Sequence, residues 1–518
     1  MPWRIGPSHV GTRVLMTAES FRKSRAPLVL LLLGAYLLLA FAWQDLPLWD
    51  FDDAMYLASG SHLHASMFLN DLTSMPLYAL WFKVLAAVCN DAVWRQFLSW
   101  ALLVVIVGVL PVLAEIPFAW LYTAVLIALP FFVIQPYVSL FAAMFFVAGM
   151  VLLLRRQMSF AEAAVVACGA CFLVAYSRPE FQYGVFFSML AVVIAVVVEG
   201  KGETKQHVLR VLLPTLILAG AMVYVVAHSD AGRSGVAFAQ HFNVRAAGKG
   251  LIPQQGAWDS TYAYRVFGID VAAHGGRHSI GEFFRANPLM FLKHVLLNVF
   301  SPGTVVFLVL SLSVILWPWF HAEKRSLRPA SLFLLLISLP TYVSLFLVFP
   351  DKHYMSIVFP ATLLLGLQWV GAERARKVEA ARWVPVVALL LMGVGCLRGT
   401  VLVKGPRFRP GLRTIGCLRG VEDLRGAGNA VVYDPVGVKD VYLRSPKMLV
   451  HPDGGGWPAF EAWAKKARPD WILITPEMEA QFGVSGEAFD AFAVSELGYR
   501  AHACGASTEL TVYVSPER

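Results

Sequence analysis

The sequence predicts a polytopic α-helical membrane protein that ends in a small α/β domain. Of its 518 residues, 58% are hydrophobic, whereas a soluble globular protein has about 45–50%. The mean hydropathy is +0.62, and several runs approach the ~20 apolar residues that a helix needs to cross a bilayer. From about Lys404 onward the composition becomes that of a soluble protein.

The basic residues behind the formal net charge of +9 are arranged around the apolar runs. Lys and Arg gather in short segments between these runs, as the positive-inside rule requires, so we expect a lipid bilayer and no nucleic acid as partner. The expected cytoplasmic segments are 1–25, Arg155-Arg156, Lys201–Arg210, His321–Arg328 and Glu373–Arg382. Residues 1–27 form the expected basic cytoplasmic amino terminus, and Pro27–Trp43 is long enough to remain as a span without cleavage.

The expected membrane domain covers residues 28–403. Threading its apolar runs with the basic segments inside places two loops, 44–75 and 228–294, on the extracytoplasmic face, together with Ser177–Glu180 and Asp351–Tyr354. The apolar runs lie at about 28–43, 160–176, 181–198, 208–227, 295–317, 330–349, 354–370 and 383–403.

The stretch 76–154 contains four further apolar runs, at about 76–90, 97–114, 117–134 and 137–154. Arg155-Arg156 on the inside demands an odd number of crossings, and the helical pattern is broken by Pro111, Pro117, Pro130 and Pro136. We therefore expect three spans and one short or re-entrant piece here, and about 11 spans in all.

Residues 404–518 are expected to form an extracytoplasmic α/β domain of roughly 110 residues. Its expected strands are Val431–Tyr433, Trp471–Thr475 and Glu509–Val514, and its expected helix is Glu461–Ala467. Cys417 and Cys504 would both lie in an oxidising compartment, where they either pair or stay free.

The first candidate for chemistry is the acidic stretch Trp49–Tyr56, which follows the first apolar run and holds Asp50, Asp52 and Asp53. In a helix, positions 50 and 53 share a face, so the three acids have different roles. A carboxylate next to apolar side chains at the membrane surface gains proton affinity, which suits a general base. The alternative is a set of solvated acids in a loop.

Two further candidates carry positive charge. Arg178, in Ser177-Arg178-Pro179-Glu180, has the planar fork that fits phosphate oxygens; alternatively it only pairs with Glu180 or snorkels. Lys352, His353 and Tyr354 open another apolar run and would bind a phosphate or sugar, or would act as ordinary anchors at a helix end.

The loop 228–294 contains an expected amphipathic helix in the membrane interface, over Glu282–His294. It either shapes the acceptor site or supports the bundle. Arg233, His241, Arg245 and Lys249 would add positive charge for an anionic substrate, or are simply solvated. His62-x-His64 has a spacing that a metal ion accepts on an extended segment, but a lone pair is weak evidence, and we assign no metal ligand.

An amino-terminal span followed by Asp52-Asp53-Ala54-Met55-Tyr56, and later by Pro76-Leu77-Tyr78, resembles the GT-C superfamily of integral-membrane glycosyltransferases, close to its protein mannosyltransferase and aminoarabinose transferase branches. The resemblance covers about residues 28–370. It implies that Asp52 is the catalytic base with Asp53 beside it, and that Tyr56, Arg178, Glu180, Lys352, His353 and Tyr354 bind donor phosphate or acceptor. Met55 stands where some relatives carry a basic residue.

The resemblance implies an inverting glycosyltransferase in the plasma (inner) membrane, with its active site on the extracytoplasmic face. The donor would be a polyprenyl-phosphate sugar, and the acceptor a glycan, lipid or protein. No cofactor is expected, although a divalent cation would be compatible. The alternatives are a transporter or flippase of a lipid-linked saccharide, and a glycan polymerase or ligase with Arg and His chemistry in its large loops. A transferase requires Asp52, Arg178 and Lys352 to converge.

Overall fold

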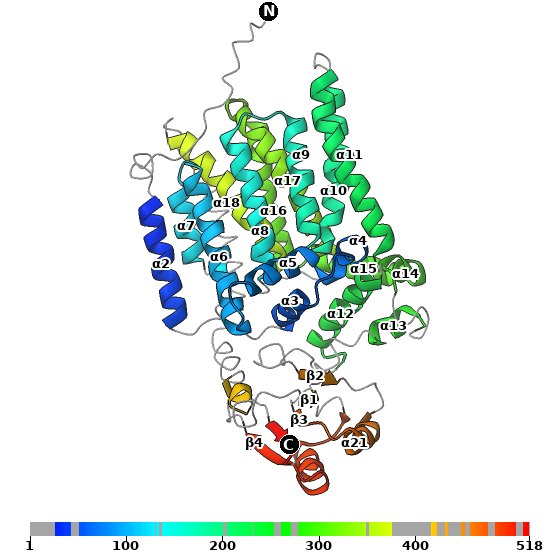
Figure 1. The fold of residues 1–518 in the computed structure, drawn as a ribbon. Helices are drawn as coiled ribbons and strands as arrows, with labels where there is room; N and C mark the ends of the chain where they lie inside the picture. Colours follow the sequence, from blue (N-terminus) through cyan, green and yellow to red (C-terminus); the bar gives the residue numbers. More distant parts are fainter. Residues whose placement is uncertain are drawn as a thin grey trace, which may run out of the picture.

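The computed structural model describes residues 26–42, 51–129, 131–133, 137–199, 205–229, 232–252, 261–270, 278–348, 352–374, 416–421, 430–433, 447–450, 456–474, 482–503 and 511–516. Most of these residues form one helical bundle (Figure 1). Its long elements are α2 (Ala26–Ala42), α6 (Ala92–Leu113), α8 (Val138–Arg155), α9 (Phe160–Ala175), α10 (Gln182–Glu199), α11 (Lys205–His228), α16 (Pro302–Phe320), α17 (Arg328–Leu347) and α18 (Lys352–Arg374).

Within the described residues, six helical segments are long and apolar enough to cross a membrane, as predicted for a helical membrane protein. They are Ala92–Leu113, Val138–Arg155, Pro179–Val198, Val208–His228, Pro302–Phe320 and Lys324–Leu347. Shorter apolar helices cover Pro27–Leu38, Pro76–Ala86, Phe160–Ala175 and Pro288–Val299. The predicted count of about 11 spans is not established by these helices, and the last expected run, 383–403, lies outside the described residues.

The stretch 76–154 contains helices of very different length. α5 (Pro76–Ala86) has 11 residues, which reach only about 17 Å at 1.5 Å per residue. α7 (Ala119–Ala128) runs back along α6, because Tyr122 and Thr123 donate hydrogen bonds to the carbonyls of Val107 and Gly108, at 3.3 and 2.7 Å. α5 and α7 are therefore both too short for a full span, since α7 has only 10 residues. Pro111, predicted as a break, lies inside α6, because membrane helices tolerate a proline whose freed backbone groups find other partners.

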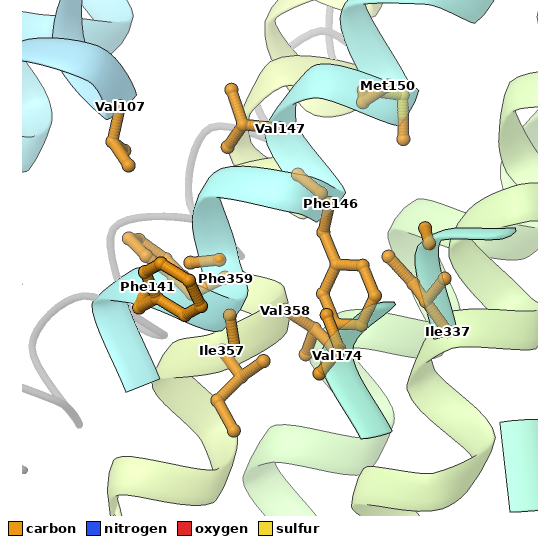
Figure 2. Packing of buried hydrophobic residues seen from close by; sticks show 14 of the residues in the cluster. Val107, Phe141, Phe146, Val147, Met150, Val174, Ile337, Ile357, Val358 and Phe359 are labelled. Carbon is orange, nitrogen blue, oxygen red and sulfur yellow. The ribbon is translucent and has the colours of Figure 1, made fainter. Parts of the chain in front are cut away.

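The core lies around α8, which packs against α6, α9, α17 and α18. Figure 2 shows the Phe146 ring of α8 lying among Val174, Ile337 and Val358, and all four side chains are buried. Gly149 lets α17 approach α8, since a Cβ there would lie 2.6 Å from the Phe333 ring. In a bilayer, where lipid tails are as apolar as these side chains, close van der Waals packing is what holds the helices of the bundle together.

The two ends of the bundle differ in chemistry. At one end, Arg155 closes α8 and forms an ion pair with Glu115 at 3.5 Å. At the other end lie short helices: α3 (Phe51–Ser61), α4 (Met67–Asn70), η1 (Leu72–Ser74), α5 and η3 (Pro179–Phe181). The helices of the stretch 228–300 lie at this same end, which we call the loop end of the bundle (Figure 1).

The stretch 228–300 is more helical than predicted. It contains α12 (Gly232–Gly248), α13 (Thr261–Phe267), α14 (Ile280–Ala286) and α15 (Pro288–Val299). The single amphipathic helix expected over 282–294 is wrong, because Pro288 starts a new helix and Asn287 caps it, accepting a hydrogen bond from the Met290 N–H at 3.1 Å. A proline at the first helical position is compatible with a helix start and not with a continuing helix.

The carboxyl-terminal region contains a five-stranded mixed sheet in the order β2-β1-β3-β5-β4. Its strands are β1 (Ala430–Tyr433), β2 (Lys447–Val450), β3 (Trp471–Ile474), β4 (Arg500–Ala503) and β5 (Thr511–Val514). The strands predicted at β1, β3 and β5 are present, and the predicted helix is part of α21 (Gly456–Ala467). β2 and β4 were not predicted: β2, Lys-Met-Leu-Val, has no alternation, and β4, Arg-Ala-His-Ala, alternates but its apolar residues are alanines, which have a low strand propensity.

A short helix at 416–421 connects the sheet to the bundle. Leu418 and Val421 pack on one face of the sheet, and Arg419 forms an ion pair with Asp91 at 2.9 Å. Asp91 caps α6, since its carboxylate accepts hydrogen bonds from the N–H groups of Val93 and Trp94. Cys417 is disulfide-bonded, and its expected partner, Cys504, lies outside the described residues.

Candidate active site

Arg178 lies at the loop end of the bundle, in the turn between α9 and η3. α9 ends at Ala175, and Pro179 starts η3, so Arg178 adopts the extended conformation that a residue before proline favours, with φ −145° and ψ 93°. The residue is 6% exposed. A buried guanidinium in a helical membrane protein is costly and marks a functional candidate.

Three groups from three elements surround the Arg178 guanidinium. Nη2 donates a hydrogen bond to Ser139 Oγ of α8 at 3.2 Å. Cζ lies 5.2 Å from the centre of the Tyr354 ring of α18, a cation–π geometry. Nε lies 3.5 Å from Glu180 Oε1, longer than the 2.7–2.9 Å typical of a charge-assisted hydrogen bond.

The Arg178–Glu180 contact means that the ion pair weighed as the alternative is present. The Arg178 side chain is 7% exposed and that of Glu180 is 20% exposed. Glu180 therefore reaches solvent at the edge of the cluster, while Arg178 is held from inside by Ser139 and Tyr354. Arg178 is thus a nearly buried cation contacted by side chains of three elements, and its binding of a phosphate stays a prediction.

The α18 motif meets the Arg178 turn through Tyr354. The imidazole of His353 lies against the Tyr354 ring, with centroids 4.1 Å apart, and the His353 carbonyl accepts a hydrogen bond from Ser356 at 2.8 Å. Lys352 begins α18, and its side chain lies outside the described atoms. Two motifs that are more than 170 residues apart in the sequence thus form one cluster.

The acidic motif lies on α3, which packs against α5. The rings of Tyr56 and Tyr78 lie 5.6 Å apart, and Tyr78 packs against Phe141 of α8 at 5.1 Å. Gly60 permits this approach, since a Cβ there would lie 2.8 Å from Phe82 Cβ and 3.1 Å from the Ala79 carbonyl. Tyr56 is buried, and its predicted contact with substrate stays a prediction.

α5 connects the acidic motif to the arginine turn. The N–H of Leu77 donates a hydrogen bond to the Tyr176 carbonyl at 3.1 Å. Tyr176 stands two residues before Arg178, and its ring packs against Phe68 at 5.8 Å. The short α5 therefore holds α3 and the Arg178 turn at the same end of the bundle.

Asp52 and Asp53 lie in the first turn of α3, and their side chains lie outside the described atoms. Position 52 precedes Tyr56 by four residues, so the backbone puts both on one helix face. Asp50 lies outside the described residues. The backbone thus brings the first turn of α3 to the end of the bundle that holds Arg178 and Tyr354; the role of either carboxylate as a base stays a prediction.

The remaining sequence candidates have other surroundings. His62 and His64 are both exposed, and the described residues contain no cluster of three or more His, Cys, Asp or Glu that would hold a metal ion. Arg245, expected to add charge for a substrate, instead donates to the carbonyls of His294 and Leu297 at 3.4 and 3.2 Å. Its guanidinium closes the end of α15.

Sequence reasoning missed several polar residues that the fold brings to this end. Ser139 gave no signal, since it lies 39 residues from Arg178 in an apolar run. The Ser177 hydroxyl is buried without a hydrogen-bond partner in the described structure. His294 and Asn298, at i and i+4 in an apolar stretch, were a detectable pattern for a buried polar face.

Cys168-Gly169-Ala170-Cys171 is a C-x-x-C sequence that a motif search should have detected. Both cysteines are free and fully buried in α9, in the apolar core of the bundle. A reactive thiol needs an electropositive and accessible setting, so these two residues are packing residues.

Comparison of this chain with protein-family models, with curated proteins and with solved structures found no match. The functional argument therefore depends on the chain's own residues and on their geometry.

Proposed function

We propose that this protein is an inverting glycosyltransferase of the GT-C type, acting on the extracytoplasmic face of the plasma (inner) membrane. It moves a sugar from a polyprenyl-phosphate donor to a glycan, lipid or protein acceptor. One observation carries the proposal: α3, the start of α5, the Arg178 turn and the start of α18 meet at one end of the bundle, although the sequence separates them widely.

In the proposed reaction, the acceptor hydroxyl or amine attacks the anomeric carbon from the face opposite the phosphate. The bond from that carbon to the phosphate oxygen breaks, and the polyprenyl phosphate leaves with the electron pair. Asp52 takes the proton of the acceptor, and Asp53 orients it. One displacement inverts the anomeric configuration.

Arg178 stabilises the charge that gathers on the leaving phosphate, with Lys352 and His353 beside it. Fixed cations aimed at developing charge give one of the largest catalytic contributions. Support comes from the way Arg178 is fixed: the Ser139 hydroxyl and the Tyr354 ring contact it within the protein, and its partner Glu180 is held at 3.5 Å. The guanidinium is therefore preorganised for an anion.

Two observations support an extracytoplasmic site. Arg155 ends α8, and Arg325 and Arg328 lie at the turn before α17. The direction of these helices puts both positions at the end of the bundle opposite the Arg178 turn. Basic helix ends face the cytoplasm. Cys417 is disulfide-bonded, and such bonds persist in oxidising compartments. Arg419, two residues away, contacts Asp91 at the start of α6.

The two rival functions receive less support. A transporter concentrates ionisable residues near the middle of its spans, whereas Arg178 and Glu180 lie in a turn at the end of α9. A polymerase or ligase would use Arg and His of the stretch 228–294, yet Arg245 and His278 are engaged with α15 carbonyls and with Glu282.

The test is sugar transfer by the full-length protein in liposomes, from a panel of labelled polyprenyl-phosphate sugars to membrane acceptors. Asp52→Asn should lower the rate by at least about 100-fold, the usual lower range for loss of a general base. Glu115→Gln, which removes a carboxylate at the opposite end of the bundle, is the control. Unchanged transfer by Asp52→Asn would show that Asp52 is not the base. Translocation of a lipid-linked saccharide without sugar transfer would show that the protein is a transporter.

A further inference from the structure

α15 is apolar on its outer face and polar on its inner face. Its inner positions, His294 and Asn298, are 2% and 0% exposed. Four of its outward side chains are large and apolar and are 41–78% exposed: Leu289, Leu292, Leu296 and Leu297. Lys293 is also exposed on this face, and a lysine at the membrane interface extends its ammonium group to water while its aliphatic chain lies along the apolar surface. A helix of this kind is suited to a lipid environment, since water would favour the reverse arrangement.

The continuation of the chain supports the same environment. Phe300, just after α15, is 71% exposed, and Val305 and Val309 on α16 are also exposed. α16 is one of the six candidate spans. The outward face of α15 therefore continues into the apolar outer face of α16, and the lipid of the bilayer is the environment that suits both faces.

The inward polar pair binds the last turn of α17. Asn298 Nδ2 donates to the carbonyls of Phe346 and Val348 at 2.8 and 3.2 Å, and His294 Nε2 lies 3.3 Å from the same Val348 oxygen. The last carbonyls of a helix have no partner within the helix, so these side chains supply it. A neutral imidazole with its proton on Nε2 donates to that oxygen.

α12 holds the pair from the other side. Arg245 donates to the His294 and Leu297 carbonyls, and the Phe238 and Phe242 rings lie 5.1 and 5.4 Å from the imidazole. The pair therefore sits between α12, α15 and α17. The α17 end that it grips stands four residues before Lys352 and six before Tyr354, whose ring contacts Arg178.

We infer that His294 and Asn298 are positioning residues: they clamp the end of α17 to a membrane-embedded α15 and so fix the start of α18, which carries Tyr354, against Arg178. This inference rests on the proposed function, because positioning has a catalytic consequence only if the Arg178 cluster binds substrate. The clamp itself is a structural relationship that can be measured without any substrate.

The experiment uses full-length protein in lipid nanodiscs. Hydrogen exchange of the segment 344–356 is measured by mass spectrometry, alongside kcat and KM for transfer. Asn298→Leu keeps the volume and removes both donors; His294→Leu removes the imidazole donor; His294→Gln places an amide nitrogen near the Nε2 position. Ser313→Ala, which removes a hydroxyl bonded to its own helix at Val309, is the control.

Asn298→Leu should speed exchange in this segment about tenfold or more, since the Phe346 carbonyl loses its side-chain donor. His294→Leu should speed exchange by a smaller factor, since Asn298 still donates to the Val348 oxygen. His294→Gln and Ser313→Ala should exchange as the wild type. In the two Leu variants, kcat for transfer should fall by a larger factor than KM rises. In His294→Gln, both constants should return toward the wild-type values. If Asn298→Leu does not fold, the comparison of His294→Leu with His294→Gln tests the clamp.

Exchange that is unchanged in the Leu variants overturns the clamp. Faster exchange with wild-type kcat overturns its positioning role. If the wild type transfers sugar from none of the polyprenyl-phosphate donors, the proposed function fails, and the exchange data still decide the clamp. The two failures are therefore distinguishable.

Discussion

The guanidinium of Arg178 lies over the ring of Tyr354, with Cζ 5.2 Å from the ring centre. The two residues come from motifs that the sequence offers separately, one in the turn before η3 and one at the start of α18. The cation–π contact helps to fix the orientation of the guanidinium, beside the Glu180 carboxylate at 3.5 Å.

The Arg178–Tyr354 contact predicts different effects for two substitutions at Tyr354. Tyr354→Phe keeps the aromatic face and should change transfer little, whereas Tyr354→Leu loses an interaction worth about 0.5–2 kcal/mol. That loss corresponds to a decrease of about threefold to thirtyfold in kcat/KM for the polyprenyl-phosphate donor. Steady-state kinetics of both variants provide the measurement. A Phe variant as impaired as the Leu variant would assign the role to the hydroxyl instead.

Gly60 predicts a steric test of the α3–α5 contact. In an ordinary helix, Gly→Ala gains about 0.5–1 kcal/mol, but here the new Cβ would meet Phe82 and the Ala79 carbonyl. Gly60→Ala should therefore destabilise the protein by about 1–3 kcal/mol, the cost of overpacking, and lower transfer by displacing the first turn of α3. Gly34→Ala, where the Cβ meets nothing within 4 Å, is the matched control. Thermal unfolding in detergent distinguishes them, and equal midpoints would contradict the close packing.

The sequence predicted those parts of the structure that depend on composition and periodicity. Apolar length and basic clusters were enough for the helical membrane class, and buried apolar runs were enough for β1 and β3. Pro117 was read correctly as a break, whereas Pro111 lies inside α6 and Pro130 lies outside the described residues. The sequence did not distinguish the short helices α5 and α7 from full spans, because the apolar runs 76–90 and 117–134 are longer than the helices found there.

The contacts of the candidate site depend on tertiary packing, which a single sequence does not encode in any local pattern. Ser139 and Arg178 meet because α8 and α9 pack side by side, and the Leu77–Tyr176 hydrogen bond depends on how α5 crosses the bundle. Residue types alone suggested Arg178 and Tyr354 as separate candidates. Only the fold shows that the two side chains contact each other.

The disulfide at Cys417 predicts a defined pairing. Cys504 is the expected partner, so non-reducing peptide mapping of the purified protein should yield one peptide that joins the two residues. Cys504→Ser should then leave Cys417 open to alkylation and destabilise the region around the sheet by about 2–4 kcal/mol. Cys89→Ser, which alters a free cysteine, should change neither property. A Cys417 peptide joined to a different cysteine would rule out the expected pairing.

The Asp91–Arg419 ion pair predicts a pH-dependent link between the sheet region and the bundle. Burial alone raises the pKa of the Asp91 carboxyl, but the hydrogen bond and charge of Arg419 and the N–H groups of Trp94 and Val93 lower it below its ordinary value of 3.8. Because the folded pKa is depressed, the stabilisation is fully present above pH 3.8 and is lost as the pH falls through the folded pKa. At neutral pH it should contribute about 1 kcal/mol or less, since the pair is partly exposed.

Asp91→Asn isolates this contribution, because asparagine still caps α6 and only the charge is lost. The difference in unfolding free energy between wild type and Asp91→Asn should be constant near neutral pH and should vanish in strong acid. Hydrogen exchange of the helix at 416–421 should rise in Asp91→Asn and in Arg419→Gln to the same extent, because either change removes the same pair. A charge-swapped protein with Asp91→Arg and Arg419→Asp should restore part of the protection. Exchange that responds to one single variant and not to the other would show that the pair does not hold this helix to the bundle.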